Sequence, residues 1–234
     1  MSSVSRWHEH YSKANEMDAQ ELIARRVAQE IRPGTLVNLG IGLPTHVADH
    51  LPPGMDVYLQ AENGIIGLGA RPPDGMEDPD LTDAGGGFVT AIPGAARIDS
   101  TLSFGLIRGG HLDMTVLGGL QVDALGRLAN WMVPGKLIPG MGGAMDLVSG
   151  ARRVVVAMFH TAKGVPKIVP RLELPLTSTR RVDLIVTEMA VIEPTDAGLV
   201  LREIAPGVDV EAVVQATAAP LIVSAPIGLM LAGA

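Results

Sequence analysis

The chain has 234 residues, of which 47% are hydrophobic and only 3% aromatic, so it can bury the core of one large α/β domain or two small ones and is not a disordered chain. The formal net charge is −7, and none of the 18 Lys and Arg residues forms a long run, which argues against a nucleic-acid partner. The absence of cysteine excludes disulfides and thiolate nucleophiles, and it fits a reducing cytoplasm.

The amino-terminal residues 1–16 are expected to form an extension ahead of the domain, which spans 17–223. They contain no apolar core, so they do not read as a secretory signal. From Asp18, the pattern D-x-x-E followed by regularly spaced apolar residues predicts a capped amphipathic helix, which Pro33-Gly34 ends.

The next segments predict a strand, a turn, a helix and a second strand. TLVNLGIG is typical of a buried strand that runs into a glycine turn, after which Thr45 is expected to cap a short helix ending near Leu51. VYLQ predicts the second strand and leads into the turn Glu62-Asn63-Gly64. The stretch RPPDGMEDPDLTDAGGG, crowded with Pro, Gly and Asp, then predicts an extended loop.

Helices and strands continue to alternate in the second half. A helix is predicted over Ser100–Ile107, ended by Gly109-Gly110. Strands are predicted at MTVLGGLQVD, RVVVAMF and DLIVTEMAVI, with a hairpin through 196–198 into LVLREI. The segment LANWMVPGKLIPGMGGAMDLV has too many Gly and Pro residues for either element, so it is expected to be a structured loop that serves a site.

The carboxyl-terminal stretch APLIVSAPIGLMLAGA is apolar but too short to span a bilayer and contains Pro226, so no membrane partner is expected. It is interpreted as a last strand followed by a tail over 224–234. We find no internal repeat or low-complexity linker, and the alternation predicts one α/β domain with an open, mixed, largely parallel sheet flanked by helices.

Glu62 is the first candidate for chemistry. Asn-Gly is a common turn dipeptide, and an acidic residue beside a turn is usually only solvated. Here, however, the turn follows a predicted buried strand, where α/β folds commonly place ligands. A carboxylate at that position is partly desolvated, which makes it a better nucleophile than a solvated one.

Two glycine-rich stretches are further candidates. In G-M-G-G-A-M, residues 140–145, successive glycines free the backbone to turn its N–H groups toward one oxyanion; the alternative is a tight crossover with close packing. N-L-G-I-G-L-P, residues 38–44, is similar to a ligand-binding strand-to-helix turn but lacks the full dinucleotide or P-loop spacing.

The remaining polar residues give weaker signals. His8 and His10 have no third ligand nearby, so no metal site is expected. The other histidines are scattered and are interpreted as structural or surface residues: His46, His50, His111 and His160. Lys136 could meet a phosphate or carboxylate, although a surface position is the simpler reading. No serine lies in a G-x-S-x-G context.

Three stretches together, LQAENGIIGLG, SFGLIRGGHLDMTVLGGLQVD and LANWMVPGKLIPGMGGAMDLV, resemble the beta subunit of the glutamate-dependent 3-oxoacid coenzyme A transferases (family I). The resemblance runs from about Met17 to Val223. It implies a ribose-5-phosphate-isomerase-like α/β fold, with Glu62 as the nucleophile and the backbone N–H groups of Gly143 and Ala144 facing the reacting carbonyl. It implies that Asn38 lines the same pocket. Gly40, Gly42 and Gly142 are expected to contact substrate or CoA.

The resemblance also implies a mechanism and a partner. An acyl-CoA is expected to acylate Glu62, and a glutamyl-CoA thioester then carries CoA to the acceptor acid. This needs no cofactor or metal, with coenzyme A acting as co-substrate. The glycine-rich alpha-subunit signature of the family is absent from this chain. A separate alpha subunit is therefore expected, in an α₂β₂ assembly.

The expected substrates are acetoacetate with acetyl-CoA or succinyl-CoA, and 3-oxoadipate is the alternative acid. Residue 86 is Gly, where mitochondrial succinyl-CoA relatives carry Lys and bacterial acetate-type relatives share the Gly, so this position gives no support to a succinate preference. Two other functions stay open. The same scaffold could hydrolyse acyl-CoA, or it could serve as a non-catalytic binding module of the kind found in sugar-phosphate-sensing regulators.

Overall fold

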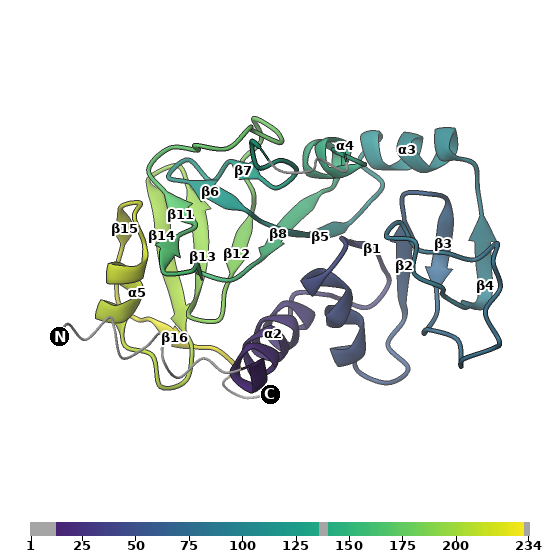
Figure 1. Cartoon of the computed structure of the whole chain (residues 1–234), viewed down its shortest axis with the longest axis horizontal. Coiled ribbons are helices and arrows are strands. Elements are labelled where there is room, and N and C mark those ends of the chain that lie inside the picture. Colours follow the sequence, from purple (N-terminus) through teal and green to yellow (C-terminus); the bar gives the residue numbers. More distant parts are fainter. Residues whose placement is uncertain (1–12, 136–139, 232–234) are drawn as a thin grey trace.

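The computed structural model describes residues 13–135 and 140–231. Within these residues, one mixed sheet of eleven strands runs through the molecule in the order β15-β14-β13-β12-β8-β5-β1-β2-β3-β4, with β16 paired to β14 (Figure 1). Its strands are β1 (Thr35–Leu39), β2 (Val57–Ala61), β3 (Ile65–Leu68), β4 (Ala91–Arg97), β5 (Met114–Gly118), β8 (Arg153–Ala157), β12 (Leu184–Val186), β13 (Ala190–Thr195), β14 (Gly198–Ile204), β15 (Leu221–Ile222) and β16 (Gly228–Leu229).

The middle of the sheet is parallel, the hairpins on either side of it are antiparallel, and the edge strands β15 and β16 pair in parallel with β14. Strands β12, β8, β5, β1 and β2 pair in parallel, whereas the hairpins β12–β13–β14 and β2–β3–β4 are antiparallel. Short strands outside this sheet form a three-stranded and a two-stranded sheet: β6 (Gln121–Asp123), β7 (Leu128–Ala129), β11 (Ile168–Val169), β9 (Thr161–Ala162) and β10 (Val165–Pro166). The open, mixed α/β sheet predicted from the alternation is confirmed.

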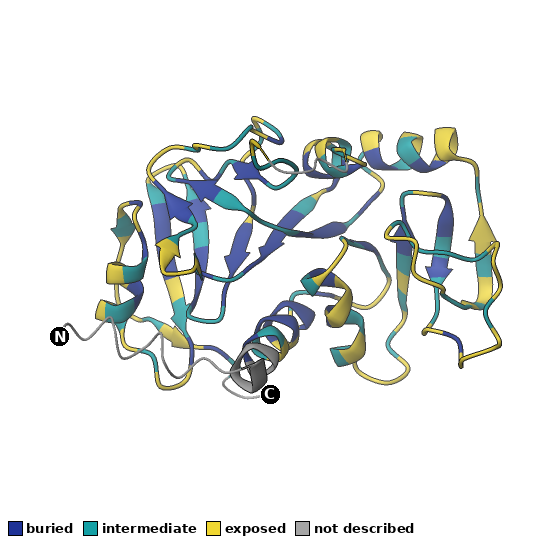
Figure 2. Cartoon of the chain, viewed as in Figure 1, coloured by how far each residue is buried: buried dark blue, intermediate teal, exposed yellow. Residues whose placement is uncertain are grey.

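Both faces of the sheet are covered, because the central strands bury apolar residues on both sides (Figure 2). In β8, Val154 and Val156 belong to one core cluster, while Val155 and Ala157 belong to the other. The first cluster is completed by α3 (Ser100–Arg108), α4 (Ala144–Gly150) and α5 (Val210–Ala216). The second is completed by α2 (Lys13–Ala28) and the 3₁₀ helix η1 (Leu43–His50).

The amino-terminal half follows the prediction with two corrections, and it contains two strands that were not predicted, β3 and β4. Helix α2 spans Lys13–Ala28, so Asp18 lies inside the helix and is not its cap. Thr45 likewise lies inside η1, whose N-cap is Gly42; the Thr45 hydroxyl donates to the Gly42 carbonyl at 2.8 Å. Helix α3 begins and ends as predicted, with the Asp99 side chain accepting from the Leu102 N–H and Gly109 as C-cap.

Two segments predicted as single strands are each divided in two. MTVLGGLQVD forms β5 and then β6, which joins the three-stranded sheet, because the chain leaves the main sheet at Gly118-Gly119. DLIVTEMAVI forms β12 and β13, which are joined by a tight turn in which Thr187 N–H donates to the Ala190 carbonyl. The predicted hairpin into LVLREI is present as β13–β14.

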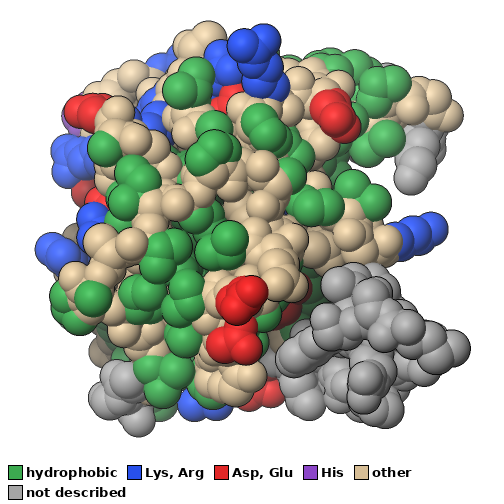
Figure 3. Space-filling view, turned by 90° about the vertical axis from the view of Figure 1, so that its left-hand side faces the viewer, with side chains coloured by type: hydrophobic (Ala, Val, Ile, Leu, Met, Phe, Trp, Pro, Cys, Tyr) green, Lys and Arg blue, Asp and Glu red, His purple; other side chains and the backbone are tan. Residues whose placement is uncertain are grey.

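The expected loop over 128–148 contains regular structure at both ends, namely β7 at its start and α4 from Ala144. The carboxyl-terminal segment forms β15 as expected, and within 224–234 it adds β16, with Met230 buried. Val214, Ile222 and Val223 are exposed. Figure 3, which faces the end of the molecule where α5 and β15 lie, shows hydrophobic side chains scattered among polar ones over this surface.

Candidate active site

Glu62 lies on the turn directly after β2, at the carboxyl-terminal edge of the parallel strands. Its side chain is half-buried. The turn needs glycine at position 64, because Gly64 has φ +123° and a Cβ there would clash with the Ile98 carbonyl oxygen. Asn63 anchors the neighbouring segment, since its Nδ2 donates to the Thr82 carbonyl at 2.7 Å and ties the 71–87 loop to the turn.

Asn38 of β1 holds the Glu62 carboxylate. Its Nδ2 donates to Glu62 Oε2 at 3.2 Å, and it also lies 3.1 Å from the Gln60 carbonyl and 3.2 Å from Gln60 Oε1. Asn38 is fully buried, and it pairs with Gln60 across β1–β2, so the two side chains share a face of the sheet. Asn38 therefore fixes the direction of the Glu62 carboxylate.

Three buried polar residues that the sequence reading passed over support this amide. Thr115 of β5 donates its hydroxyl to Asn38 Oδ1 at 3.2 Å, which turns the Asn38 NH₂ group toward Glu62. Gln60 Nε2 donates to the Ser103 hydroxyl of α3 at 2.9 Å, which turns the Gln60 Oε1 toward Asn38. The amide orientations follow from this hydrogen-bond network as a whole.

Gly143 closes the other side of the carboxylate. A Cβ at this position would lie 3.1 Å from Glu62 Cγ and 3.2 Å from Glu62 Oε1, so a side chain here would press on the glutamate and push it aside by a few tenths of an ångström. Glu62 and Gly143, which are far apart in the sequence, thus lie in contact. Helix α4, which follows Gly143, is tied to α3 by an ion pair of 2.7 Å between Arg108 and Asp146.

The glycine-rich stretch turns as its composition predicts. Gly140 and Gly142 have φ values of +108° and +55°, which side chains other than glycine rarely adopt. The Gly143 N–H makes no hydrogen bond to another described residue, and the Ala144 N–H makes only a long bond of 3.4 Å to the Met141 carbonyl. Within the described chain, therefore, the Gly143 N–H has no hydrogen-bond acceptor and the Ala144 N–H has only a distant one.

Gly40 and Gly42 lie on the loop that follows β1, away from these contacts. The Gly40 N–H donates to the Val116 carbonyl at 2.8 Å, and a Cβ there would press on Leu117, so Gly40 serves the packing of β1 against β5. Gly42 has φ +84° and opens η1. The structure gives neither residue a contact with Glu62.

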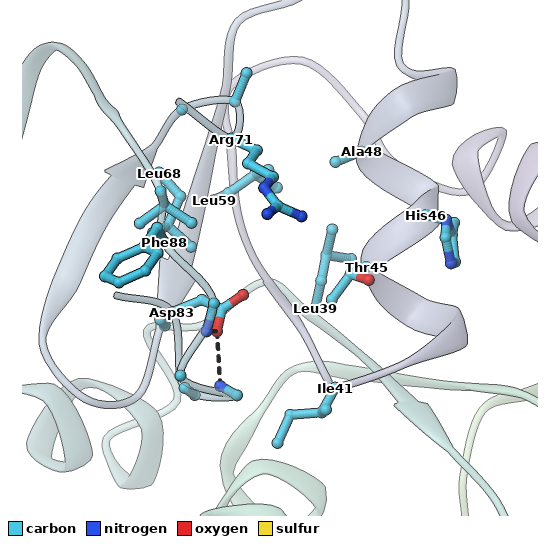
Figure 4. Close-up of a pocket in the computed structure, with 18 of the residues that line it drawn as sticks. Leu39, Ile41, Thr45, His46, Ala48, Leu59, Leu68, Arg71, Asp83 and Phe88 are labelled. Carbon is cyan, nitrogen blue, oxygen red and sulfur yellow. Dashed lines mark hydrogen bonds between the residues drawn. The ribbon is translucent and has the colours of Figure 1, made fainter. Parts of the chain in front are cut away.

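A cavity of about 660 Å³ lies beside the turn, on the face of the sheet that η1 covers (Figure 4). Ala61, next to Glu62 in the chain, lines it, whereas Glu62 itself is not among the lining residues. The other walls come from β1, η1, β3 and the loop from 69 to 89. Its size is in the range of small-molecule sites.

No histidine of the described residues is hydrogen-bonded to Glu62. His160 is buried and bonded through both ring nitrogens, to the Thr187 and Thr217 hydroxyls. Burial, and secondarily the charge of Lys167, lowers the pKa of His160 to about 4. His46 and His111 are exposed. His8, His10 and Lys136 lie outside the described residues.

The site therefore consists of a glutamate at the end of a strand of a mixed α/β sheet, held by a hydrogen bond and lying close to a glycine-rich turn. This arrangement suits group transfer through an acylated carboxylate. A family profile described as Coenzyme A transferase matches residues 20–216. The beta subunit of the acetate CoA-transferase of Escherichia coli K12 is 55% identical over 89% of this chain and 96% of its own length. The B subunit of the probable succinyl-CoA:3-ketoacid coenzyme A transferase of Bacillus subtilis is 47% identical over 88% and 96%.

A solved structure agrees with these sequence relatives. The acyl-CoA transferase YdiF of Escherichia coli O157:H7 superposes with a TM-score of 0.74 at 28% identity, over 91% of this chain and 43% of that one. The chain belongs to the coenzyme A transferase family. Among the helices of the described residues, none is long and apolar enough to cross a membrane.

Proposed function

We propose that this chain is the beta subunit of a CoA transferase that moves CoA between an acyl-CoA and a 3-oxoacid such as acetoacetate, with Glu62 as the covalently acylated nucleophile. The observation that carries the proposal is the position of the Glu62 carboxylate. It is held by Asn38 on one side and lies against Gly143 on the other.

In the first step, Glu62 attacks the thioester carbonyl of the donor and expels CoA thiolate, which leaves an acyl-glutamyl anhydride. The thiolate then attacks the Glu62 carbonyl of that anhydride, which gives a glutamyl-CoA thioester and releases the first acid. The acceptor carboxylate repeats the two steps in reverse. Every intermediate is activated, so the free energy of the thioester is retained and no ATP is consumed.

A carboxylate is a poor nucleophile toward a thioester, so the site must lower the barrier by positioning and by charge stabilisation. Positioning can supply effective molarities on the order of 10⁵ M or more. The Gly143 and Ala144 amides are proposed to donate to the oxyanion that forms on the attacked carbonyl. One such donor is typically worth about 10² to 10³ in rate.

Water must be kept from the anhydride. Ile65, which is buried, and Ile66, which is half-buried, follow the Glu62 turn in the sequence, and half-buried Met141 precedes Gly143. These three side chains are proposed to contribute apolar cover.

We propose that an alpha subunit completes the active site, in an α₂β₂ assembly. The lengths support this, since the chain corresponds to less than half of the YdiF polypeptide and to nearly all of the relatives named as beta subunits.

The test measures the rate of CoA transfer by the chain assembled with its alpha subunit. It compares the parent protein with the Glu62→Gln variant. We expect transfer from acetyl-CoA or succinyl-CoA to acetoacetate to fall by at least about 10⁴ in the variant, since the nucleophile is lost and the shape is kept. Met76→Gln serves as the control, because Met76 is an exposed residue of the 71–87 loop.

Assays with different acceptor acids, and with no acceptor, distinguish the alternative substrates and functions. If 3-oxoadipate is a much better acceptor than acetoacetate, the substrate assignment changes and the mechanism stands. CoA release that is independent of any acceptor acid would identify an acyl-CoA hydrolase. Full CoA-transfer activity of Glu62→Gln would overturn the proposed role of Glu62. If the assembled parent protein neither transfers nor releases CoA, a non-catalytic binding module is the remaining interpretation.

A further inference from the structure

The first turn of helix α4 contains an acidic side chain that does not cap the helix. The N-cap is Gly143, which has no side chain to accept hydrogen bonds from the first turn, and Asp146 follows it three residues later. In a capping box, an acidic side chain at this third position turns back and accepts from the backbone N–H of the N-cap residue. A self-capped α4 would therefore bind the Asp146 carboxylate to the Gly143 N–H.

An arginine of the neighbouring helix binds Asp146 instead. Arg108 Nε donates to Asp146 Oδ1 at 2.7 Å, and the two helices that carry these residues, α3 and α4, lie side by side (Figure 1). The Asp146 side chain accepts from no backbone N–H of the described residues. The Gly143 N–H accordingly keeps no acceptor within the described chain.

Arg108 is held in its position by its own helix. Its guanidinium carbon lies 5.4 Å from the centre of the Phe104 ring, one turn earlier on α3, which is within the range of a cation–π contact. Phe104 packs against the larger core cluster. The arginine is thus oriented by the fold, and through the ion pair it gives the Asp146 carboxylate its direction.

That direction matters because the amides at the start of α4 lie beside the reacting group. Gly143 is in contact with Glu62, and the N–H groups of Gly143 and Ala144 are the proposed donors to the oxyanion. A carboxylate bound to the Gly143 N–H would occupy that donor. It would also place a negative charge where the negative oxyanion has to form, so both effects would raise the barrier.

We propose that Arg108 is a positioning residue, which draws Asp146 away from the Gly143 N–H and keeps this amide open for the reaction. Without Arg108, the first turn of α4 caps itself and the enzyme is inhibited by its own side chain. This rests on the proposed CoA transfer at Glu62 and names a residue that controls the oxyanion donors. Two other roles of Arg108 predict different results, namely joining α3 to α4 and binding a phosphate of CoA.

The test compares Arg108→Met, Asp146→Ala and the variant that combines both changes, each in the assembled enzyme. Methionine keeps an unbranched side chain that can pack on Phe104, and it removes the charge. We expect kcat of Arg108→Met to fall at least about tenfold, with the KM for acyl-CoA unchanged within about twofold, because an oxyanion donor is occupied. Asp146→Ala and the combined variant are expected to stay within about threefold of the parent kcat, since the blocking carboxylate is gone.

Arg152→Met is the matched control. Arg152 pairs with Asp113 at 2.8 Å, and their side chains are 63% and 29% exposed, close to the 66% and 27% of Arg108 and Asp146. Removing this second ion pair is expected to change kcat and KM by less than about twofold.

Similar losses of kcat in all three variants would show that the ion pair acts only by joining the two helices, and they would overturn the inference. A higher KM for every acyl-CoA in Arg108→Met that Asp146→Ala does not restore would assign Arg108 to a CoA phosphate and overturn it as well. Full activity of Arg108→Met would have the same consequence, while leaving the role of Glu62 intact.

A crystal structure of the assembled Arg108→Met enzyme gives a readout that is independent of turnover. We expect the Asp146 carboxylate to accept from the Gly143 N–H at about 3 Å. A carboxylate that stays turned away from this amide would overturn the inference, and this result can be judged even if Glu62 proves not to be acylated.

Discussion

The orientation of a single amide decides where the Glu62 carboxylate points. Asn38 can present either its NH₂ group or its oxygen to Glu62, and only the NH₂ group attracts a carboxylate. The hydroxyl of Thr115 donates to Asn38 Oδ1 and thereby selects the productive orientation. Thr115 touches neither Glu62 nor any proposed substrate position, so it acts as a positioning residue.

Thr115→Val tests this role, because valine keeps the shape of threonine and removes the hydroxyl. Asn38 Oδ1 then loses its donor, and the amide can turn its oxygen toward Glu62. We expect kcat for CoA transfer to fall about tenfold with little change in KM, corresponding to one orienting hydrogen bond. Transient kinetics of glutamyl-CoA formation give the measurement.

Thr115→Ser keeps the hydroxyl and is expected to retain most of the parent rate. Equal losses in the Val and Ser variants would show that packing at this buried position, and not the hydrogen bond, controls the rate.

Sequence reasoning identified Glu62, Asn38 and Gly143, and the structure brings these three together. It passed over Gln60, Ser103 and Thr115, although each is a polar residue inside an apolar strand or helix. The signal was available in L-Q-A, L-S-F and M-T-V, but their meaning depends on the register of β1 with β2 and β5. Register is a property of the assembled sheet, which local sequence does not specify.

At the scale of elements, the turn between β2 and β3 shapes the site by close backbone contact. Gly64 lies against the Ile98 carbonyl, and Ile98 N–H donates back to the Gly64 carbonyl at 2.9 Å. This contact holds the β2–β3 hairpin against the segment that leads from β4 into α3. The Asn-Gly pair therefore has two separate functions, since Asn63 anchors the following loop.

Gly64→Ala is expected to lower the free energy of unfolding by at least about 2 kcal/mol, because the new Cβ meets a backbone carbonyl and φ is positive. Gly54→Ala is the matched control, since Gly54 has φ +75° but open space around a Cβ, and about 1 kcal/mol is expected there. Urea unfolding measures both. Equal losses in the two variants would mean that backbone conformation alone, without the Ile98 contact, limits position 64.

The glycine-rich segment before α4 shows why some element boundaries escaped prediction. Its Gly and Pro content argued for a loop, and Gly140 and Gly142 do adopt loop conformations. The helix that follows is short and is fixed by tertiary contacts, such as Arg108 with Asp146 from α3. Propensity is a weak guide where such packing decides.

At the scale of the whole molecule, His160 connects distant parts of the fold. It lies just after β8, and its ring is bonded to Thr187 in the β12–β13 turn and to Thr217 at the end of α5. Its backbone N–H donates to Glu188 Oε2 at 2.8 Å. Because burial lowers the pKa of His160 to about 4, the folded protein keeps this ring neutral at pH values where the unfolded chain protonates it.

The unfolded state therefore binds more protons between about pH 6.5 and pH 4, and the His160 contribution to stability is lost as the pH falls through that window. We expect the difference in unfolding free energy between the parent and His160→Gln to shrink by about 2 kcal/mol from pH 6.5 to 4.5. Burial raises the pKa of Glu188, an effect of opposite sign that both proteins share.

His111→Gln makes the same substitution at an exposed position, outside this buried network, and is the control. A pH-independent difference between the parent and His160→Gln would mean that the ring is not held neutral in the folded state.

The central claim is that Glu62 becomes covalently linked to CoA, and chemical trapping tests it most directly. The assembled enzyme is incubated with acyl-CoA, reduced with borohydride, digested and examined by mass spectrometry. We predict that the peptide containing Glu62 carries the primary alcohol formed by reducing its thioester, and that Glu62→Gln gives no such product. An unmodified Glu62 in an enzyme that is turning over, or the same label on another carboxylate, would contradict the account.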